Sequence, residues 1–306
     1  MPNLAIPTIF RALVLAGSFS LLLSAQAQEP SVQRYASENG RNIKVASTGN
    51  LIGLEAPGGF EHIDSKRARE GYVLAYSDPF SGASRVLHDV FDRYSTTIKV
   101  PFRDFQVVSY SSSPVGVLLN LNDQVTATSV VETRDGLLRL THVLNWKAGT
   151  GTVTVTTTVT NISGLPLLLR SFKRHIDVDL DSAGPYGAAH YQNSIVTDPG
   201  LGSVLIFNGS RCYPQPFDSP ICPPRPLPIN LVAASNHLMQ ISGNPLPTHT
   251  IVKDAGDDGE LTSALPGPSL IGRRDFEDNQ VTLAWMLNQS LNPGASKSFA
   301  VTYQVN

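Results

Sequence analysis

The sequence is poor in cysteine and in charge. Only two of its 306 residues are cysteines, 16% are Asp, Glu, Lys or Arg, and the formal net charge is −2. No basic cluster stands out, so the electrostatic footprint of a nucleic-acid-binding protein is missing. Nucleic acid is therefore not an expected partner.

The common sequence signatures of catalysis are also missing. There is no G-x-S-x-G nucleophile elbow, no H-E-x-x-H zinc motif, no phosphate loop and no dinucleotide fingerprint. Cysteine spacing of the zinc type is absent as well. These absences leave open a serine triad, because its members meet in space and not in sequence.

Long hydrophobic runs are absent apart from one near the start. Residues 12–23 are apolar, and Ala25 and Ala27 follow as a small-x-small cleavage signature. The run is too short to span a bilayer, so residues 1–27 are predicted to be a signal peptide that is removed. We expect a secreted or periplasmic chain with no membrane span after this removal, and a polar lead-in over residues 28–42.

The two cysteines, Cys212 and Cys222, lie in a proline-rich segment near residues 212–228. An exported chain meets an oxidising compartment, so the pair is predicted to form a disulfide. Closing so short a loop contributes roughly 2–3 kcal/mol in the chain-entropy model. The spacing is not that of a C-x-x-C redox motif, which favours a structural bond.

Alternating residues dominate the rest of the chain. In "GTVTVTTTVTN" Val153, Val155 and Val159 point to one side, and the threonines at 154, 156, 158 and 160 point to the other. Many such segments are separated by Gly and Pro, and no capped helical pattern appears. The sequence predicts an all-β fold with little helix: one large antiparallel β-sandwich of about 15 strands over residues 43–306.

One predicted strand carries a row of polar residues. In "SFKRHIDVDLD" alternation places Ser171, Lys173, His175, Asp177, Asp179 and Asp181 on a single face. Three interpretations are open. The face is solvated or ion-paired; or Asp177, Asp179 and Asp181 bind a cation such as Ca²⁺; or His175, Asp177 and Asp179 act as catalytic acid and base.

Two further segments contain candidate ligands. The glycine-rich loop "KDAGDDGE" includes Asp254, Asp257 and Asp258, which either bind Ca²⁺ or form a solvated turn. Tyr186, His190 and Tyr191 follow the acidic strand and are ligand-binding candidates, because aromatic rings stack on sugars. The alternative for these three is ordinary loop packing. Trp285 lies in an alternating strand and is expected in the core.

Several segments resemble those of bacterial exported β-sandwich proteins without a characterised role. They are "GNLIGLEAPGGFEHI", "EGYVLAYSD", "TVTNISGLPLLLRSFKRHIDVDLD" and "VTLAWMLNQSLNPGASKSFAVTYQV". The strand layout is also similar to the supersandwich of galactose-mutarotase-like domains, whose members commonly bind or process carbohydrate. The resemblance transfers no catalytic residue, because the histidine and glutamate of mutarotases have no matching positions here.

These observations lead to three functional hypotheses. The first is an exported, non-catalytic protein that binds carbohydrate or another cell-surface partner. The second is a carbohydrate-active hydrolase or epimerase that uses the carboxylates of residues 175–181. The third is a structural or adhesive module stabilised by Ca²⁺, the one cofactor that the acidic segments suggest.

Overall fold

The computed structural model describes residues 31–55, 61–63, 70–91, 104–114, 118–177, 193–198, 203–208, 238–254, 259–270, 272–277 and 279–305. Nineteen strands form this part of the chain, with one short helix, α2 (Gly259–Thr262). The all-β prediction is confirmed, with more strands than expected. No described helix is long and apolar enough to cross a membrane.

The strands form three sheets. The first has the order β4 (Glu61–Ile63), β3 (Leu51–Glu55), β2 (Asn42–Ala46), β1 (Val32–Ser37), β8 (Leu118–Leu119). The large sheet has the order β17 (Gly272–Glu277), β13 (Asn193–Asp198), β14 (Ser203–Asn208), β15 (Leu238–Asn244), β19 (Ser296–Val305), β11 (Thr152–Asn161), β10 (Leu138–Lys147), β9 (Gln124–Thr133), β7 (Phe105–Ser113). The third has the order β16 (His249–Asp254), β18 (Asn279–Leu291), β12 (Leu167–Asp177), β5 (Glu70–Ser77), β6 (Ser84–Phe91).

Pairing is antiparallel throughout, except between β1 and β8. The strand β1 lies within the segment predicted to be a polar lead-in.

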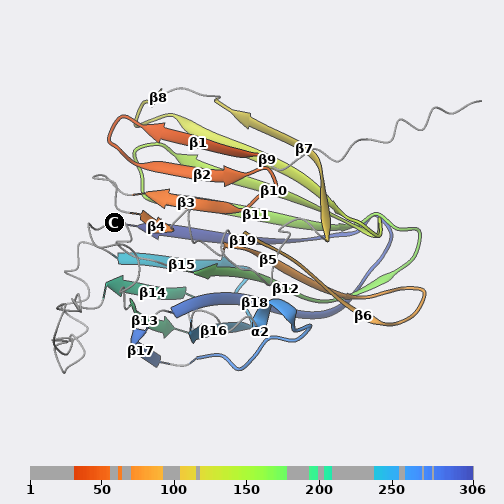
Figure 1. Cartoon of the computed structure of the whole chain (residues 1–306). Coiled ribbons are helices and arrows are strands. Elements are labelled where there is room, and N and C mark those ends of the chain that lie inside the picture. Colours follow the sequence, from red (N-terminus) through yellow and green to blue (C-terminus); the bar gives the residue numbers. More distant parts are fainter. Residues whose placement is uncertain are drawn as a thin grey trace, which may run out of the picture.

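The first and third sheets form one layer, and the large sheet forms the other (Figure 1). One continuous apolar core fills the space between them and includes Ile43, Phe172 and Val153, one from each sheet. Along β11 the valines are buried and the alternate threonines are half-buried, as the sequence predicts. Trp285 is also in the core, where its indole N–H donates to Pro245 O at 2.6 Å.

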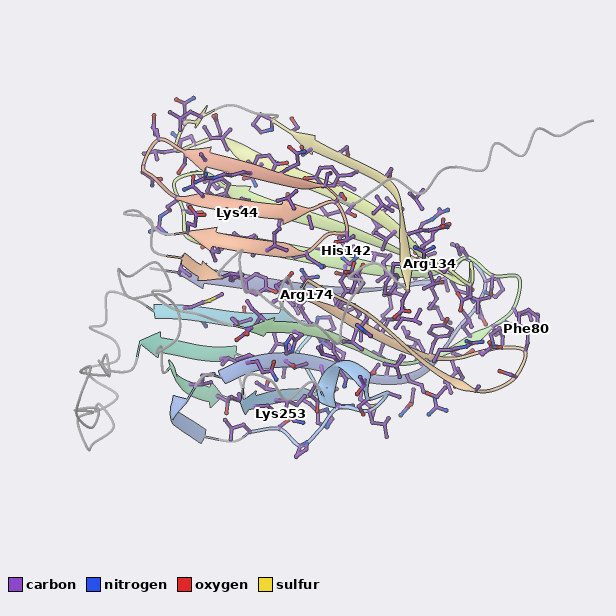
Figure 2. The ribbon with its side chains drawn as sticks, in the orientation of Figure 1. Lys44, Phe80, Arg134, His142, Arg174 and Lys253 are labelled. Carbon is purple, nitrogen blue, oxygen red and sulfur yellow. The ribbon has the colours of Figure 1, made fainter. Side chains whose placement is uncertain are left out.

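A network of charged and polar side chains crosses this core and joins the layers. Arg174 on β12 lies 2.5 Å from the carboxylate of Glu70 on β5, and both are almost fully buried. The Tyr303 hydroxyl of β19 donates to Glu70 at 3.1 Å, and Arg174 donates to Gly49 O at 3.3 Å. Figure 2 shows Arg174 between the two layers. Burial would lower the pKa of Arg174, but the attraction of Glu70 raises it, so its guanidinium stays charged.

A second part of the network surrounds Tyr72. Its hydroxyl donates to Asp89 at 3.1 Å, and its ring lies 4.5 Å from that of His142 on β10. Burial, with the nearby charge of Arg174, holds the pKa of His142 well below its usual value, so the ring is neutral. Gly49 is required beside this ring, since its φ is +91° and a side chain there would overlap His142.

Candidate functional site

The polar face of β12 is buried. Lys173 is 0% exposed, His175 1% and Asp177 9%. Alternation correctly places these side chains on one face. The expectation that this face is solvated is wrong for its four described members, Ser171, Lys173, His175 and Asp177, which are all buried. The ion-paired part of that interpretation holds for Lys173, which pairs with Glu260.

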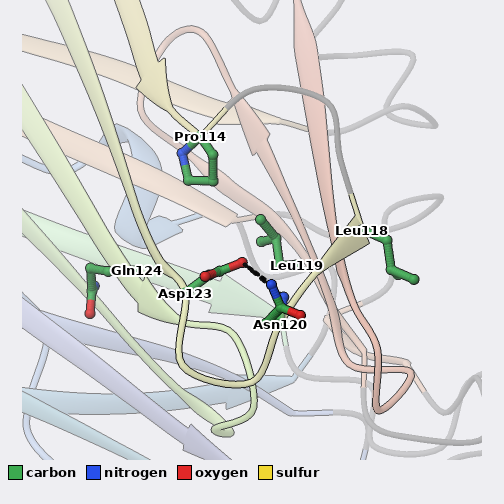
Figure 3. A pocket seen from close by; sticks show the side chains of 6 residues that line it. All are labelled: Pro114, Leu118, Leu119, Asn120, Asp123 and Gln124. Carbon is green, nitrogen blue, oxygen red and sulfur yellow. Dashed lines mark hydrogen bonds between the residues drawn. The ribbon is translucent and has the colours of Figure 1, made fainter.

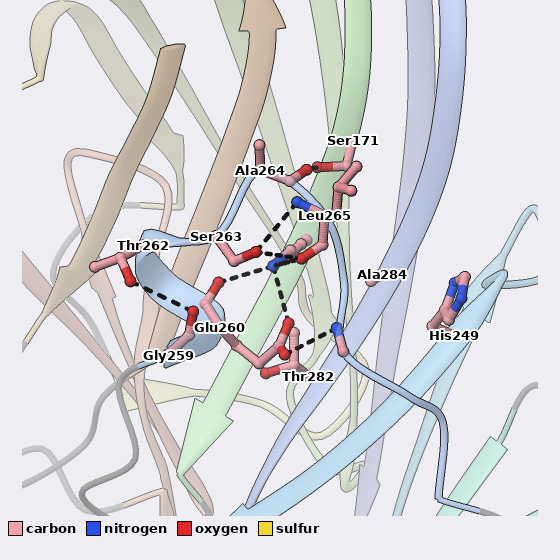
Figure 4. Close-up of polar contacts among 12 residues, drawn as sticks. Ser171, His249, Gly259, Glu260, Thr262, Ser263, Ala264, Leu265, Thr282 and Ala284 are labelled. Atoms are coloured by element: carbon pink, nitrogen blue, oxygen red, sulfur yellow. Dashed lines mark hydrogen bonds and ion pairs between the residues drawn. The ribbon is translucent and has the colours of Figure 1, made fainter. Parts of the chain in front are cut away.

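The segment 259–270, which begins with α2, lies over the end of this face that carries Ser171 and Lys173. Figure 4 shows Ser171 beside Ala264 of the segment. The Lys173 ammonium donates to Glu260 Oε2 and Glu260 O, both at 2.9 Å, and to Leu265 O at 3.3 Å. Ser171 Oγ donates to Ala264 O at 2.7 Å. Burial lowers the pKa of Lys173, although the Glu260 carboxylate opposes this effect. The contacts anchor the segment to β12.

Strand register brings further polar side chains beside His175 and Asp177. Thr282 on β18 lies opposite His175, with its Oγ1 2.8 Å from the imidazole Nδ1. Gln280 on β18 lies opposite Asp177 on one side and opposite Lys253 of β16 on the other. We call these five residues the β18 polar rows. They combine a carboxylate, an amide, an ammonium, an imidazole and a hydroxyl on neighbouring strands.

The strands β12 and β16 finish at the same end of the third sheet. Both β12 and β16 pair antiparallel with β18, so they are parallel to each other and separated by one strand. Asp177 ends β12 and Asp254 ends β16. Asp177 and Asp254 therefore mark the same end of the third sheet.

The remaining predicted site residues lie outside the described residues, so these predictions stay predictions. They are Asp179, Asp181, Tyr186, His190, Tyr191, Cys212, Cys222, Asp257 and Asp258. Within the described part of the chain, no group of three or more His, Cys, Asp or Glu side chains is arranged to hold a metal ion.

Sequence reasoning placed Glu260 in the acidic loop but missed its contact with Lys173, and it missed Gln280 and Thr282 altogether. Glu260 lies 87 positions after its partner Lys173 in the chain, and Thr282 lies 107 positions after its partner His175. The only available signal was alternation in "NQVTLAWM", which places Gln280 and Thr282 on one face of a strand.

A separate pocket lies at the other end of the sandwich, beside β7 and β8. It has a volume of about 340 Å³ and is lined by Pro114, Leu118, Leu119, Asn120, Asp123 and Gln124 (Figure 3). The Asn120 backbone N–H donates to the Asp123 carboxylate at 2.8 Å, which closes the turn beneath it.

No family model and no curated protein matches the chain. Among solved structures, a putative aldose 1-epimerase from Escherichia coli K12 is similar at a TM-score of 0.45 and 13% identity, over 90% of this chain and 99% of that one. A galactose mutarotase-like protein from Lactobacillus casei gives 0.42 and 10%, over 90% and 100%.

A bacterial glucoamylase complexed with acarbose gives a TM-score of 0.47 and 7% identity over 90% of this chain. The chain spans about a third of that enzyme, 32% of its length. All three TM-scores lie below 0.5, so function has to be argued from the residues of this chain.

Proposed function

We propose that the protein binds carbohydrate at the β18 polar rows. The observation that carries this proposal is the register that aligns Asp177, Gln280 and Lys253 across three neighbouring strands. A sugar presents hydroxyls that both donate and accept hydrogen bonds. The carboxylate accepts, the ammonium donates and the amide does both, which matches a chain of sugar hydroxyls.

The surroundings strengthen these polar groups. Lys253 is the most accessible member of the rows, with 28% of its side chain exposed, whereas Gln280 and Thr282 behind it are 3% and 2% exposed. Hydrogen bonds in such an environment are electrostatically stronger than in water. The rows also belong to strands inside a sheet, which position side chains more rigidly than loops do.

A catalytic version of this site has its own support. The contact between His175 Nδ1 and Thr282 Oγ1 at 2.8 Å fixes the orientation of the imidazole, the side chain that most often serves as a catalytic acid or base. Asp177 lies on the same face, two residues along β12. An epimerase or hydrolase using this pair would need His175 for turnover and the polar rows for binding.

The test is a glycan panel followed by calorimetry. The chain should bind at least one mono- or oligosaccharide, and Asp177→Asn should weaken that binding about tenfold or more, since a charge-assisted hydrogen bond is lost. Failure of every glycan to bind would overturn the proposal.

His175→Gln separates a binding protein from an enzyme. In an enzyme this change should abolish ring-opening or hydrolysis of the bound sugar while the dissociation constant changes little. If the wild-type chain binds sugar but never converts it, the protein is a binding protein.

A Ca²⁺-stabilised module is the second candidate, favoured because β12 and β16, which the two acidic segments follow in the sequence, finish at the same end of the third sheet, at Asp177 and Asp254. If Ca²⁺ binds the folded state and not the unfolded state, the melting temperature should rise in excess Ca²⁺ and return to its starting value in chelator. Unchanged melting in Ca²⁺ and in chelator would exclude this candidate.

A further inference from the structure

The strand β7 forms one edge of the large sheet (Figure 1). Within the described part of the chain it pairs only with β9, and the pairing has a β-bulge between Val107 and Ser109. Beyond the bulge, residues 109–113 are regular and carry no charge and no proline. Charge, proline and bulges protect natural edge strands, because unpaired backbone groups attract another strand, and in β7 the bulge interrupts only the part before Ser109.

We propose that residues 109–113 of β7 pair antiparallel with the same residues of a second copy of this chain. A two-fold axis at Ser111 places that residue opposite itself in the two copies. Ser109 of each copy then lies opposite Ser113 of the other copy. Such an interface is isologous, so every contact is made twice.

The exposed serines of β7 suit this pairing. Ser109, Ser111 and Ser113 are exposed. Ser111 lies beside Thr128 of β9, and Ser113 beside Thr126, so they belong to the hydroxyl-rich outer face of the large sheet. On that face Thr158 and Ser298 are already bonded across strands at 2.8 Å, and Thr160 and Ser296 at 2.9 Å. The dimer would continue the same hydroxyl pairs from one copy to the next.

The ends of the paired segment are complementary as well. Val108, the extra residue of the bulge, is 48% exposed. With the axis at Ser111, Val108 lies opposite Pro114 of the second copy. Pro114 lines the pocket of about 340 Å³, together with Leu118, which is 67% exposed, and Leu119. Each copy therefore offers one apolar side chain and one pocket with an apolar wall of Pro114, Leu118 and Leu119, at positions that the symmetry brings together.

Charge does not oppose pairing with a second copy, and the symmetric fit of Val108 and Pro114 favours that copy as the partner. The segment 109–113 is uncharged, so self-pairing places no like charges opposite each other. In the pocket, the carboxylate of Asp123 is held by Asn120 through its backbone and side-chain N–H groups. Five paired residues with two valine contacts make a small interface, so the dimer should depend on protein concentration.

Sedimentation velocity over a range of concentrations tests the proposal. The chain should change from monomer to dimer as concentration rises. Ser111→Lys places two ammonium groups opposite each other at the axis and should abolish the dimer. Thr158→Lys, on the same sheet face but on β11, is the matched control and should leave dimerisation unchanged.

Cysteine cross-linking tests the register. Ser111→Cys should form an intermolecular disulfide on oxidation, because opposite Cβ atoms in a strand pair lie about 4.5–5.5 Å apart. Ser109→Cys alone should not, since it lies opposite serine. A chain that stays monomeric at every concentration, or a dimer that Ser111→Lys leaves intact, would overturn the proposal.

Discussion

Two ion pairs of this protein differ in their surroundings. Glu70 and Arg174 are 0% and 2% exposed, whereas Glu132 and Arg139 are 17% and 46% exposed. Removing one partner of a buried pair leaves a charge without compensation, which costs about 3–5 kcal/mol. Exposed pairs contribute about 1 kcal/mol or less.

Glu70→Gln should therefore lower the free energy of unfolding by about 3–5 kcal/mol, and Glu132→Gln by less than about 1 kcal/mol. Urea denaturation of both variants checks the difference. Equal, small losses would show that the core network does not need the Glu70 charge.

Asp89 links stability to pH. Burial raises its pKa to about 8, although the Tyr72 hydroxyl bond opposes this rise. The unfolded-state pKa is about 3.9, so the folded state holds the proton more tightly. The stability from this group is fully present below about pH 4 and is lost as the pH rises through 8.

The free energy of unfolding should therefore fall by a few kcal/mol from about pH 5 to about pH 9. Asp89→Asn carries no titratable group and should remove this part of the slope. Urea denaturation at both pH values measures the effect. Identical pH slopes in variant and wild type would contradict a buried, protonated Asp89.

For single residues, the sequence predicts the face of the strand on which a side chain lies better than it predicts the residues that surround that side chain. It placed His175 and Asp177 on one face, because side chains alternate along any strand. It could not predict that Glu260 and residues 263–270 cover the Lys173 end of that face, since nothing near Lys173 in the chain indicates a partner 87 residues away. It also missed Arg174 as a buried cation, because Glu70 lies on another strand.

Among elements, the segment 259–270 is anchored to β12 by the buried Lys173 side chain. Three acceptors of the segment surround the Lys173 ammonium, two of them on Glu260. Lys173→Met keeps the buried length of the side chain but removes the donors. The segment should then open more often than the strands beneath it.

Hydrogen exchange measures this opening. Amides of residues 259–270 should exchange faster in Lys173→Met, while amides of β11 should not change. Lys147→Met, an exposed lysine at the end of β10, is the control and should match wild type. Uniformly faster exchange across the chain would instead indicate a loss of global stability.

Strands were the most predictable elements. The valine and threonine faces of β11 follow from alternation and from the apolar core on one side. The short strand β4 was not predicted, because three residues leave no periodic signal.

For the whole molecule, the sandwich class was predictable and the sheet order was not. Many turn-separated alternating segments favour stacked antiparallel sheets. The division of one layer into two sheets, and the position of β18 between β12 and β16, depend on pairings between distant segments. The β18 polar rows exist only because of that order, so sequence reasoning found His175 and Asp177 but not their neighbours.

The most direct test of the carbohydrate proposal compares two glutamines of one strand. Gln280 lies in the β18 polar rows and is 3% exposed, and Gln289 lies on β18 outside them and is exposed. Calorimetric titration with the glycan that binds best should show weaker binding for Gln280→Ala and wild-type binding for Gln289→Ala. Equal binding by both folded variants and the wild type would contradict a carbohydrate site at these rows.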